Sequence, residues 1–173
     1  MLGYRYEIEP AGIDETLPSG ISPQQAVEWL SCRKAEAVAQ KHPTDVVLAA
    51  DTLVACGKQI LGIPADEEKA KEYLCLLSGK IHDVYTGCTI IGEKKKKTFS
   101  VRARVEFYPL TKEEIAAYIA TGEPFDKAGA YGIQGRGSVL VKGIQGDFYT
   151  IMGLPVSRVT RELREFQVFP EEK

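Results

Sequence analysis

The segment from Phe99 to Phe107 alternates apolar and polar residues without a break. Every odd-numbered position in it is apolar, and every even-numbered position is polar or charged. A period of two is typical of a β-strand that buries one face and leaves the other in water. The chain must therefore build a sheet with an apolar side, and other elements have to cover that side.

Helix signals and further strands are interleaved along the chain. Ser22, Pro23 and Gln25 supply the N-cap, the first-turn proline and the capping box of a helix expected to run to about His42. The same kinds of pattern predict strands at 4–9, 45–50, 82–91 and 138–142, and helices at 66–78, 111–121 and 156–166. This order predicts one α/β domain over 1–173, with a mixed β-sheet flanked by helices.

Charge and hydropathy exclude several classes of protein. The formal net charge is −2, so no basic field is available to hold a nucleic-acid polymer, and Lys94 to Lys97 are expected to form a solvated hairpin tip. No apolar run approaches the ~20 residues of a membrane span, and residues 1–9 lack the apolar core of a signal peptide. The four cysteines have no zinc-site spacing. We therefore expect a cytoplasmic protein with no membrane partner.

A carboxylate follows a short apolar run. Residues 46–50 are Val, Val, Leu, Ala and Ala, as expected of a strand covered on both faces, and Asp51 ends this run. Asp51 is either a turn-capping residue or a functional acid at the end of a strand. Residues 53–55 remain apolar, which favours the functional acid. Because a buried charge is costly unless it is compensated, this position implies a cation or hydrogen bonds nearby.

Three other charged residues leave two interpretations open. Lys34 falls on the inward face of the first helix, between Leu30 and Val38 at a spacing of four residues. It is either a lysine whose stem passes the edge of the core or an anion-binding lysine. Asp14 and Glu15 precede that helix as adjacent carboxylates. They form either a solvated acidic loop or a metal or phosphate site. Taken alone, two adjacent carboxylates favour the solvated loop.

Four of the eleven residues from Lys127 to Gly137 are glycine. Lysine, glutamine and arginine stand among them, where a flexible linker would carry serine and proline. Glycine permits positive φ and close approach to a ligand, and the amide of Gln134 can read the edge of a base. A plain surface loop is the alternative, but the order of residues favours a shaped binding loop.

Several short motifs occur in an order that resembles the Maf family of nucleoside triphosphate pyrophosphatases. They are Asp14-Glu15, Arg33-Lys34-Ala35, Ala50-Asp51-Thr52, Leu77-Ser78-Gly79, Val84-Tyr85-Thr86-Gly87, residues 126–135 and Gly153-Leu154-Pro155. The resemblance covers nearly the whole chain. It implies an elongated α/β fold similar to that of inosine triphosphate pyrophosphatases, with a cleft across the sheet. It also implies hydrolysis of a nucleoside triphosphate between the α and β phosphates, giving a monophosphate and pyrophosphate.

The resemblance assigns catalytic roles to three residues. Asp51 matches the general base that activates the attacking water. Glu15 matches an acidic residue that helps to hold the metal, so Glu15 and Asp51 are the expected ligands of Mg²⁺ or Mn²⁺. Lys34 matches a lysine that contacts the phosphates.

The resemblance also implies a substrate. Thr52 and Gln134 match positions associated with base choice, and Lys127 belongs to the same motif as Gln134. Threonine with glutamine resembles the branch acting on dTTP and UTP, which leaves CTP open as a third substrate. We therefore expect a pyrimidine nucleotide whose base edge pairs with the Gln134 amide. The resemblance is compatible with a homodimer but does not decide the oligomeric state.

Two departures from the family pattern favour an alternative function. Members normally begin with a strand and a Ser-x-Ser-Pro-Arg-Arg loop before a pair like Leu2-Gly3, where this chain starts, so we expect an N-terminally truncated domain. Ile63 stands where relatives usually have lysine, and an aliphatic side chain cannot neutralise a phosphate oxygen. The alternative is a catalytically weak nucleotide-binding regulator of septum formation and cell division. The intact candidate site residues favour the enzyme.

Overall fold

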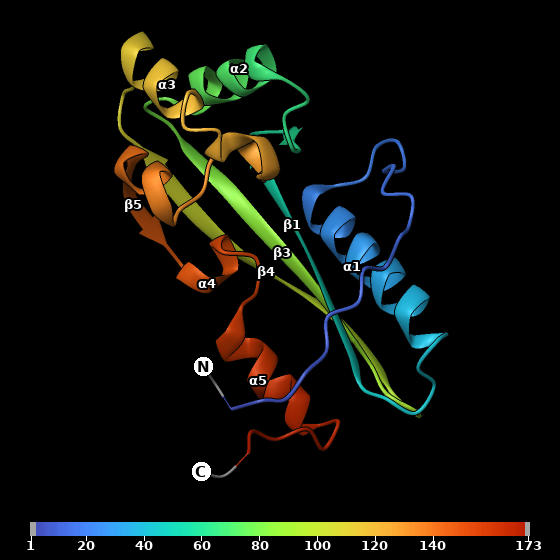
Figure 1. Ribbon diagram of the computed structural model, residues 1–173. Helices are drawn as coiled ribbons and strands as arrows, with labels where there is room; N and C mark the ends of the chain where they lie inside the picture. Colours follow the sequence, from blue (N-terminus) through green and yellow to red (C-terminus); the bar gives the residue numbers. More distant parts are fainter. Residues whose placement is uncertain (1–2, 172–173) are drawn as a thin grey trace.

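A five-stranded sheet in the order β2-β1-β3-β4-β5 forms the centre of the computed structural model, which describes residues 3–171 (Figure 1). Leu2 of the Leu-Gly pair lies outside these residues. The strands are β1 (Val47–Cys56), β2 (Gln59–Leu61), β3 (Ile81–Ile91), β4 (Lys96–Phe107) and β5 (Val141–Gln145). The long strands β1, β3 and β4 give the molecule its elongated shape (Figure 1).

The predicted α/β class is confirmed, but the predicted mixed sheet is wrong. Every strand pairing within residues 3–171 is antiparallel. The hairpin from β1 into β2 reverses the chain before α2 (Glu67–Leu77) begins, so that β3 returns antiparallel to β1. A parallel neighbour would have required a crossover that enters the sheet from the same end as β1.

The predicted helices begin where the sequence places them, but the first ends at Ala39 and not near His42, and the short helix at Phe148–Ile151 is not predicted. Ser22 and Thr111 each form a complete capping box, at the start of α1 (Pro23–Ala39) and of α3 (Lys112–Ile119). Two further helices, α4 (Phe148–Ile151) and α5 (Val156–Arg164), follow β5. Short 3₁₀ turns lie between α3 and β5: η1 (Glu123–Asp126), η2 (Ala128–Ala130) and η3 (Gly135–Leu140). None of the described helices combines the length and apolar character needed to cross a bilayer.

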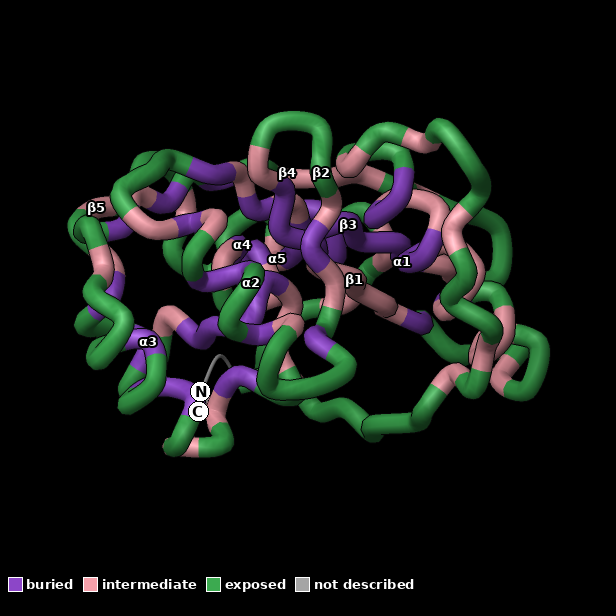
Figure 2. The backbone as a smooth tube through the Cα atoms, turned by 90° about the horizontal axis from the view of Figure 1, so that it is seen from above, coloured by how far each residue is buried: buried purple, intermediate pink, exposed green. Residues whose placement is uncertain are grey.

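The two faces of the long strands are covered by different helices. On one face Val27 of α1 packs with Leu53 of β1, and Gly87 of β3 permits very close approach. A Cβ on that glycine would lie 2.3 Å from the carbonyl oxygen of Val27. On the other face Cys88 and Ile90 pack against α5. A third apolar cluster lies between α2, α3 and the end of the sheet. Figure 2 shows that most exposed residues lie in the loops that connect the helices and strands.

Several expected elements differ from those observed. Tyr4 to Glu9 forms no strand, and Tyr6 and Ile8 are largely exposed. Alternation alone cannot make a strand, because the backbone also needs a neighbouring strand to pair with. The strand expected at 138–142 starts only at Val141, after η3. Asp51 does not end its strand but lies in the middle of β1, since pairing with β3 continues to Ala55.

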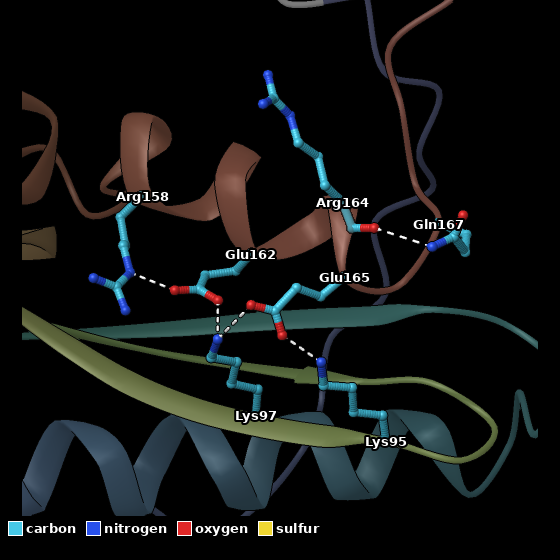
Figure 3. A network of polar contacts seen from close by, with 7 residues as sticks. All are labelled: Lys95, Lys97, Arg158, Glu162, Arg164, Glu165 and Gln167. Carbon is cyan, nitrogen blue, oxygen red and sulfur yellow. Dashed lines mark hydrogen bonds and ion pairs between the residues drawn. The ribbon is translucent and has the colours of Figure 1, made fainter.

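Lys94, Lys95 and Lys96 at the β3–β4 hairpin are exposed, as expected of a solvated tip, but Lys95 and Lys97 also pair with carboxylates near the end of α5, which the sequence does not predict. Lys95 and Lys97 contact Glu165 near the end of α5, and Lys97 also contacts Glu162 within it (Figure 3). Arg158 holds Glu162 from the preceding turn of α5. We call these five residues the brace cluster. They join the hairpin to α5, which the sequence pattern of four adjacent lysines does not reveal.

Candidate functional site

A cavity of about 930 Å³ lies beside the part of β1 that extends past β2. β2 pairs only with Val54–Cys56, so within the described chain the preceding residues of β1 have a strand neighbour on one side only. The wall of the cavity includes every site residue expected from the sequence: Glu15, Lys34, Asp51, Thr52, Lys127 and Gln134. These residues span about 120 positions, counted from Glu15 to Gln134, and the fold brings them to one space.

Lys34 stands between two carboxylates, and we call Glu15, Lys34 and Asp51 the site cluster. The Nζ atom of Lys34 lies 2.6 Å from Oδ1 of Asp51 and 2.9 Å from Oε1 of Glu15. Helix α1 presents the lysine to β1, and the loop before that helix presents Glu15. The Asp51 side chain keeps only 9% of its surface exposed, against 56% for Glu15. Lys34 is therefore the cation partner that the position of Asp51 implied.

Burial raises the pKa of Asp51, and the charge of Glu15 acts in the same direction. The Lys34 ammonium opposes this rise without cancelling it. Burial also works against the charge of Lys34, yet the contacts with Asp51 and Glu15 outweigh it and raise the pKa of that ammonium. The cluster thus holds a carboxylate that is more basic than a surface aspartate beside a lysine that stays charged.

Asp14, the other carboxylate of the acidic pair, does not reach the cavity wall. It accepts hydrogen bonds from the backbone N–H and the hydroxyl of Thr16, at 2.9 and 2.7 Å. Arg33 donates to the carbonyl oxygen of Asp14 at 2.9 Å. Asp14 therefore stabilises the shape of the loop, whereas Glu15 faces the cavity.

Thr52 enters the cavity from the opposite face of the sheet to Asp51, because successive strand residues point to opposite sides. Val54 shares the face of Thr52 and packs against Gly129, where a Cβ would lie 2.9 Å from the valine side chain. Gly129 also has φ of 72°, which favours glycine. This contact places the loop that carries Lys127 and Gln134 on the Thr52 side of the cavity.

The shape of the glycine-rich loop depends on two residues that the sequence analysis did not single out. Glu123 accepts hydrogen bonds from the backbone N–H groups of Arg136 and Gly137, at 2.9 and 3.0 Å. The hydroxyl of Tyr118 donates to Glu123 and accepts from the N–H of Gly132. These partners lie 5 to 14 residues apart, and no short motif signals their contact.

The charge of the wall bears on which cofactor fits. Its charged side chains are two lysines, Lys34 and Lys127, and three carboxylates, Glu15, Asp51 and Asp126, with a formal sum of −1. A polyphosphate would meet this wall at a disadvantage unless a cation accompanied it. Glu15 and Asp51 flank Lys34, each contacting it through one carboxylate oxygen, and two neighbouring carboxylates suit a Mg²⁺-like ion that takes its other ligands from phosphates and water. No larger cluster of His, Cys, Asp or Glu suited to a metal occurs in residues 3–171.

Comparison with known proteins identifies the family of this chain. The family model described as Maf-like protein matches residues 1–166. A dTTP/UTP pyrophosphatase of Bacillus cereus is 50% identical over 163 residues, which cover 94% of this chain and 85% of the relative. A dTTP/UTP pyrophosphatase of Bacillus mycoides is 51% identical over 161 residues, covering 93% and 84% of the two chains. The resemblance seen in the motifs is confirmed, and the chain belongs to the Maf-like protein family.

Proposed function

We propose that this chain hydrolyses dTTP and UTP to their monophosphates and pyrophosphate, with CTP as a third nucleotide to test. The observation that carries the proposal is the pairing of Asp51 with Lys34 in the wall of a cavity large enough for a nucleotide. The dTTP/UTP pyrophosphatases among its relatives support the choice of substrates.

In this proposal Asp51 is the general base. Its carboxylate takes a proton from water while the water oxygen bonds to the α phosphorus. The bond from that phosphorus to the bridging oxygen breaks, and the electron pair leaves with pyrophosphate. The raised pKa of Asp51 supports this role because it makes the carboxylate a better proton acceptor, and Lys34 favours its ionised form.

The other wall residues bind and orient the nucleotide. An ammonium has three N–H groups, and Asp51 and Glu15 take two of those of Lys34, which leaves one for a phosphate oxygen. Thr52 and Gln134 meet the base on the far side of the sheet edge. Lys127 braces the loop that carries Gln134, since its side chain lies against Gly132, where a Cβ would come within 2.7 Å of it.

Glu15 and Asp51 are the residues that would hold a divalent cation, Mg²⁺ or Mn²⁺. When bound, the ion supplies positive charge that offsets the phosphate oxygens. The negative wall supports this requirement, since its own lysines do not outnumber its carboxylates.

The test is pyrophosphate release from dTTP, UTP, CTP, ATP and GTP with Mg²⁺ or Mn²⁺. We expect release from dTTP and UTP, and a loss of ~10²-fold or more in Asp51→Asn because the base is gone. Asp14→Asn is the matched control, as Asp14 lies outside the cavity wall. Equal rates in Asp51→Asn and in the unchanged protein would remove Asp51 from the mechanism.

One observation favours a second candidate, a catalytically weak nucleotide-binding regulator. Ile63 lies in the cavity wall with 62% of its surface exposed, and it offers no charge to a phosphate. The same nucleotide panel separates the two functions. Nucleotide binding without pyrophosphate release in either metal would favour the regulator.

A further inference from the structure

The motif Val84–Gly87 contains a buried hydroxyl to which the mechanism gives no role. Thr86 lies in the middle of β3 and is fully buried. Its Oγ1 lies 2.7 Å from the carbonyl oxygen of Thr150 in α4 and 2.8 Å from Oγ1 of Thr52. Thr52 is the register partner of Thr86 on β1, so the two side chains share one face of the sheet.

The direction of these two hydrogen bonds is fixed by chemistry. A threonine hydroxyl has a single hydrogen, and a carbonyl oxygen can only accept. Thr86 must therefore donate to the carbonyl of Thr150, and Thr52 must donate to Thr86. With its hydrogen committed, the Thr52 hydroxyl can offer only lone pairs to anything in the cavity.

The lone pairs of Thr52 have room to meet a ligand. Thr52 lines the cavity, and Gly153 beside it carries no side chain. A Cβ at position 153 would be in ordinary van der Waals contact with Oγ1 of Thr52, at 3.6 Å, so the glycine leaves the space beside this oxygen open. Thr86 itself does not line the cavity and can influence a ligand only through Thr52.

We propose that Thr86 is a positioning residue that fixes the Thr52 hydroxyl as an acceptor for the N3–H of a uracil or thymine base. This inference rests on the proposed function. Uracil and thymine carry a hydrogen on N3, whereas cytosine has a lone pair there. A fixed acceptor therefore binds the first two bases and repels the third, since a site built for one hydrogen-bond pattern rejects the opposite pattern.

The test compares UTP with CTP in Thr86→Val, which keeps the shape of the side chain and removes the hydroxyl. Thr52 can then turn its hydrogen toward the cavity. We expect KM for UTP to rise about tenfold with kcat nearly unchanged, and the UTP/CTP ratio of kcat/KM to fall by at least that factor. Thr86→Ser retains the hydroxyl and should restore both values.

Thr89→Val is the matched control. Thr89 is also fully buried on β3, but its hydroxyl contacts Ser31 and Thr98 and it does not line the cavity. We expect Thr89→Val to lower the melting temperature and to leave the UTP/CTP ratio unchanged. An unchanged ratio in folded Thr86→Val, or an equal change in Thr89→Val, would overturn the inference.

Dissociation constants for UMP and CMP keep the inference separate from the proposed function. These monophosphates carry the same bases and need no turnover. If the unchanged protein releases no pyrophosphate, the proposed function fails, yet weaker discrimination of UMP from CMP in Thr86→Val would still support the role of Thr86. Equal discrimination in both proteins would refute that role.

Discussion

The site cluster and the brace cluster use the same kinds of side chain for different purposes. Each contains a nearly buried carboxylate, Asp51 with 9% of its side chain exposed and Glu162 with 6%. Glu162 meets two cations where α5 contacts the hairpin, whereas Asp51 shares one lysine with a second carboxylate and faces a cavity. An excess of carboxylate beside open space suits binding and catalysis. A carboxylate enclosed by cations contributes to stability.

Replacing a lysine by methionine should change kcat/KM far more in the site cluster than in the brace cluster, and this is the largest effect that we expect. We expect Lys34→Met to lower kcat/KM by ~10²-fold to 10³-fold, because it removes the charge that we propose contacts the phosphates. Without that cation, two carboxylates face each other, the pKa of Asp51 rises further, and the acid limb of the pH–rate profile moves to higher pH. Pyrophosphate release measured across pH checks both effects.

Lys97→Met is the control for this prediction. It removes a lysine of the brace cluster, so kcat/KM should stay within about twofold, in line with its absence from the cavity wall. A similar loss of rate in the two variants would mean that Lys34 acts through the fold and not through the substrate.

Glu162→Gln should give the largest loss of stability. The carboxylate is nearly buried, and its loss removes the charged partner of Arg158 and one of the two carboxylates that Lys97 contacts. Hydrogen bonds to charged groups are worth about 1.5–3 kcal/mol, which corresponds to a fall of roughly 3–12 °C in Tm for a protein of this size. Differential scanning calorimetry measures this fall in Tm, and the rate of pyrophosphate release should be unaffected.

Glu36→Gln supplies the exposed counterpart of Glu162→Gln. Glu36 lies 2.6 Å from Lys96, but 48% of its side chain is exposed. We expect a change of no more than ~0.5 kcal/mol, as for most surface ion pairs. An equal loss of stability in the two variants would show that burial does not separate the brace cluster from ordinary surface pairs.

Asp51→Asn should have the opposite sign to Glu162→Gln. Burial raises the pKa of Asp51 despite Lys34, so the folded state carries this charge at a cost. We expect the neutral amide to raise Tm by up to ~2 °C while turnover falls ~10²-fold or more, a trade of stability for activity that is common at active sites. A fall in Tm as large as that of Glu162→Gln would mean that Asp51 also holds the fold together.

The smallest expected effect concerns acid pH. The contact with Lys95 and, to a smaller extent, the contact with Lys97 lower the pKa of Glu165 from 4.5 to about 2. Because the folded-state pKa is depressed, this stabilisation is complete above pH 4.5 and is lost as the pH falls toward 2. Glu165 is half exposed, so the effect is small. Tm measured from pH 5 to 2 should fall less steeply in Glu165→Gln, and identical slopes would exclude the pairing.

Asp51 shows how far a sequence pattern reaches. A carboxylate after an apolar run implied a buried charge and a cation near it, and Lys34 lies 2.6 Å away. The same pattern placed Asp51 at the end of the strand, whereas β1 continues to Cys56. A run of apolar residues reports burial, but the length of a strand also depends on its neighbours, and β3 pairs with β1 as far as Ala55.

The sequence by itself determined the local elements of this protein. Helix starts at Ser22 and Thr111 follow from side chains that cap the backbone three residues away, and the alternation from Phe99 follows from the strand period. Interactions between residues two or three positions apart can be predicted from neighbouring residues in the sequence. The order of the short motifs along the chain was also enough to identify the family.

Only the tertiary structure decided the direction of the strands, the role of the hairpin lysines and the chain from Thr52 through Thr86 to Thr150. The partners in that chain are separated by 34 and 64 positions. No local sequence pattern shows that Thr52 will lie opposite Thr86. This pairing depends on the register of β1 against β3, and many registers are possible for two strands. The sequence supplied the chemistry of the site, and packing decided which atoms meet.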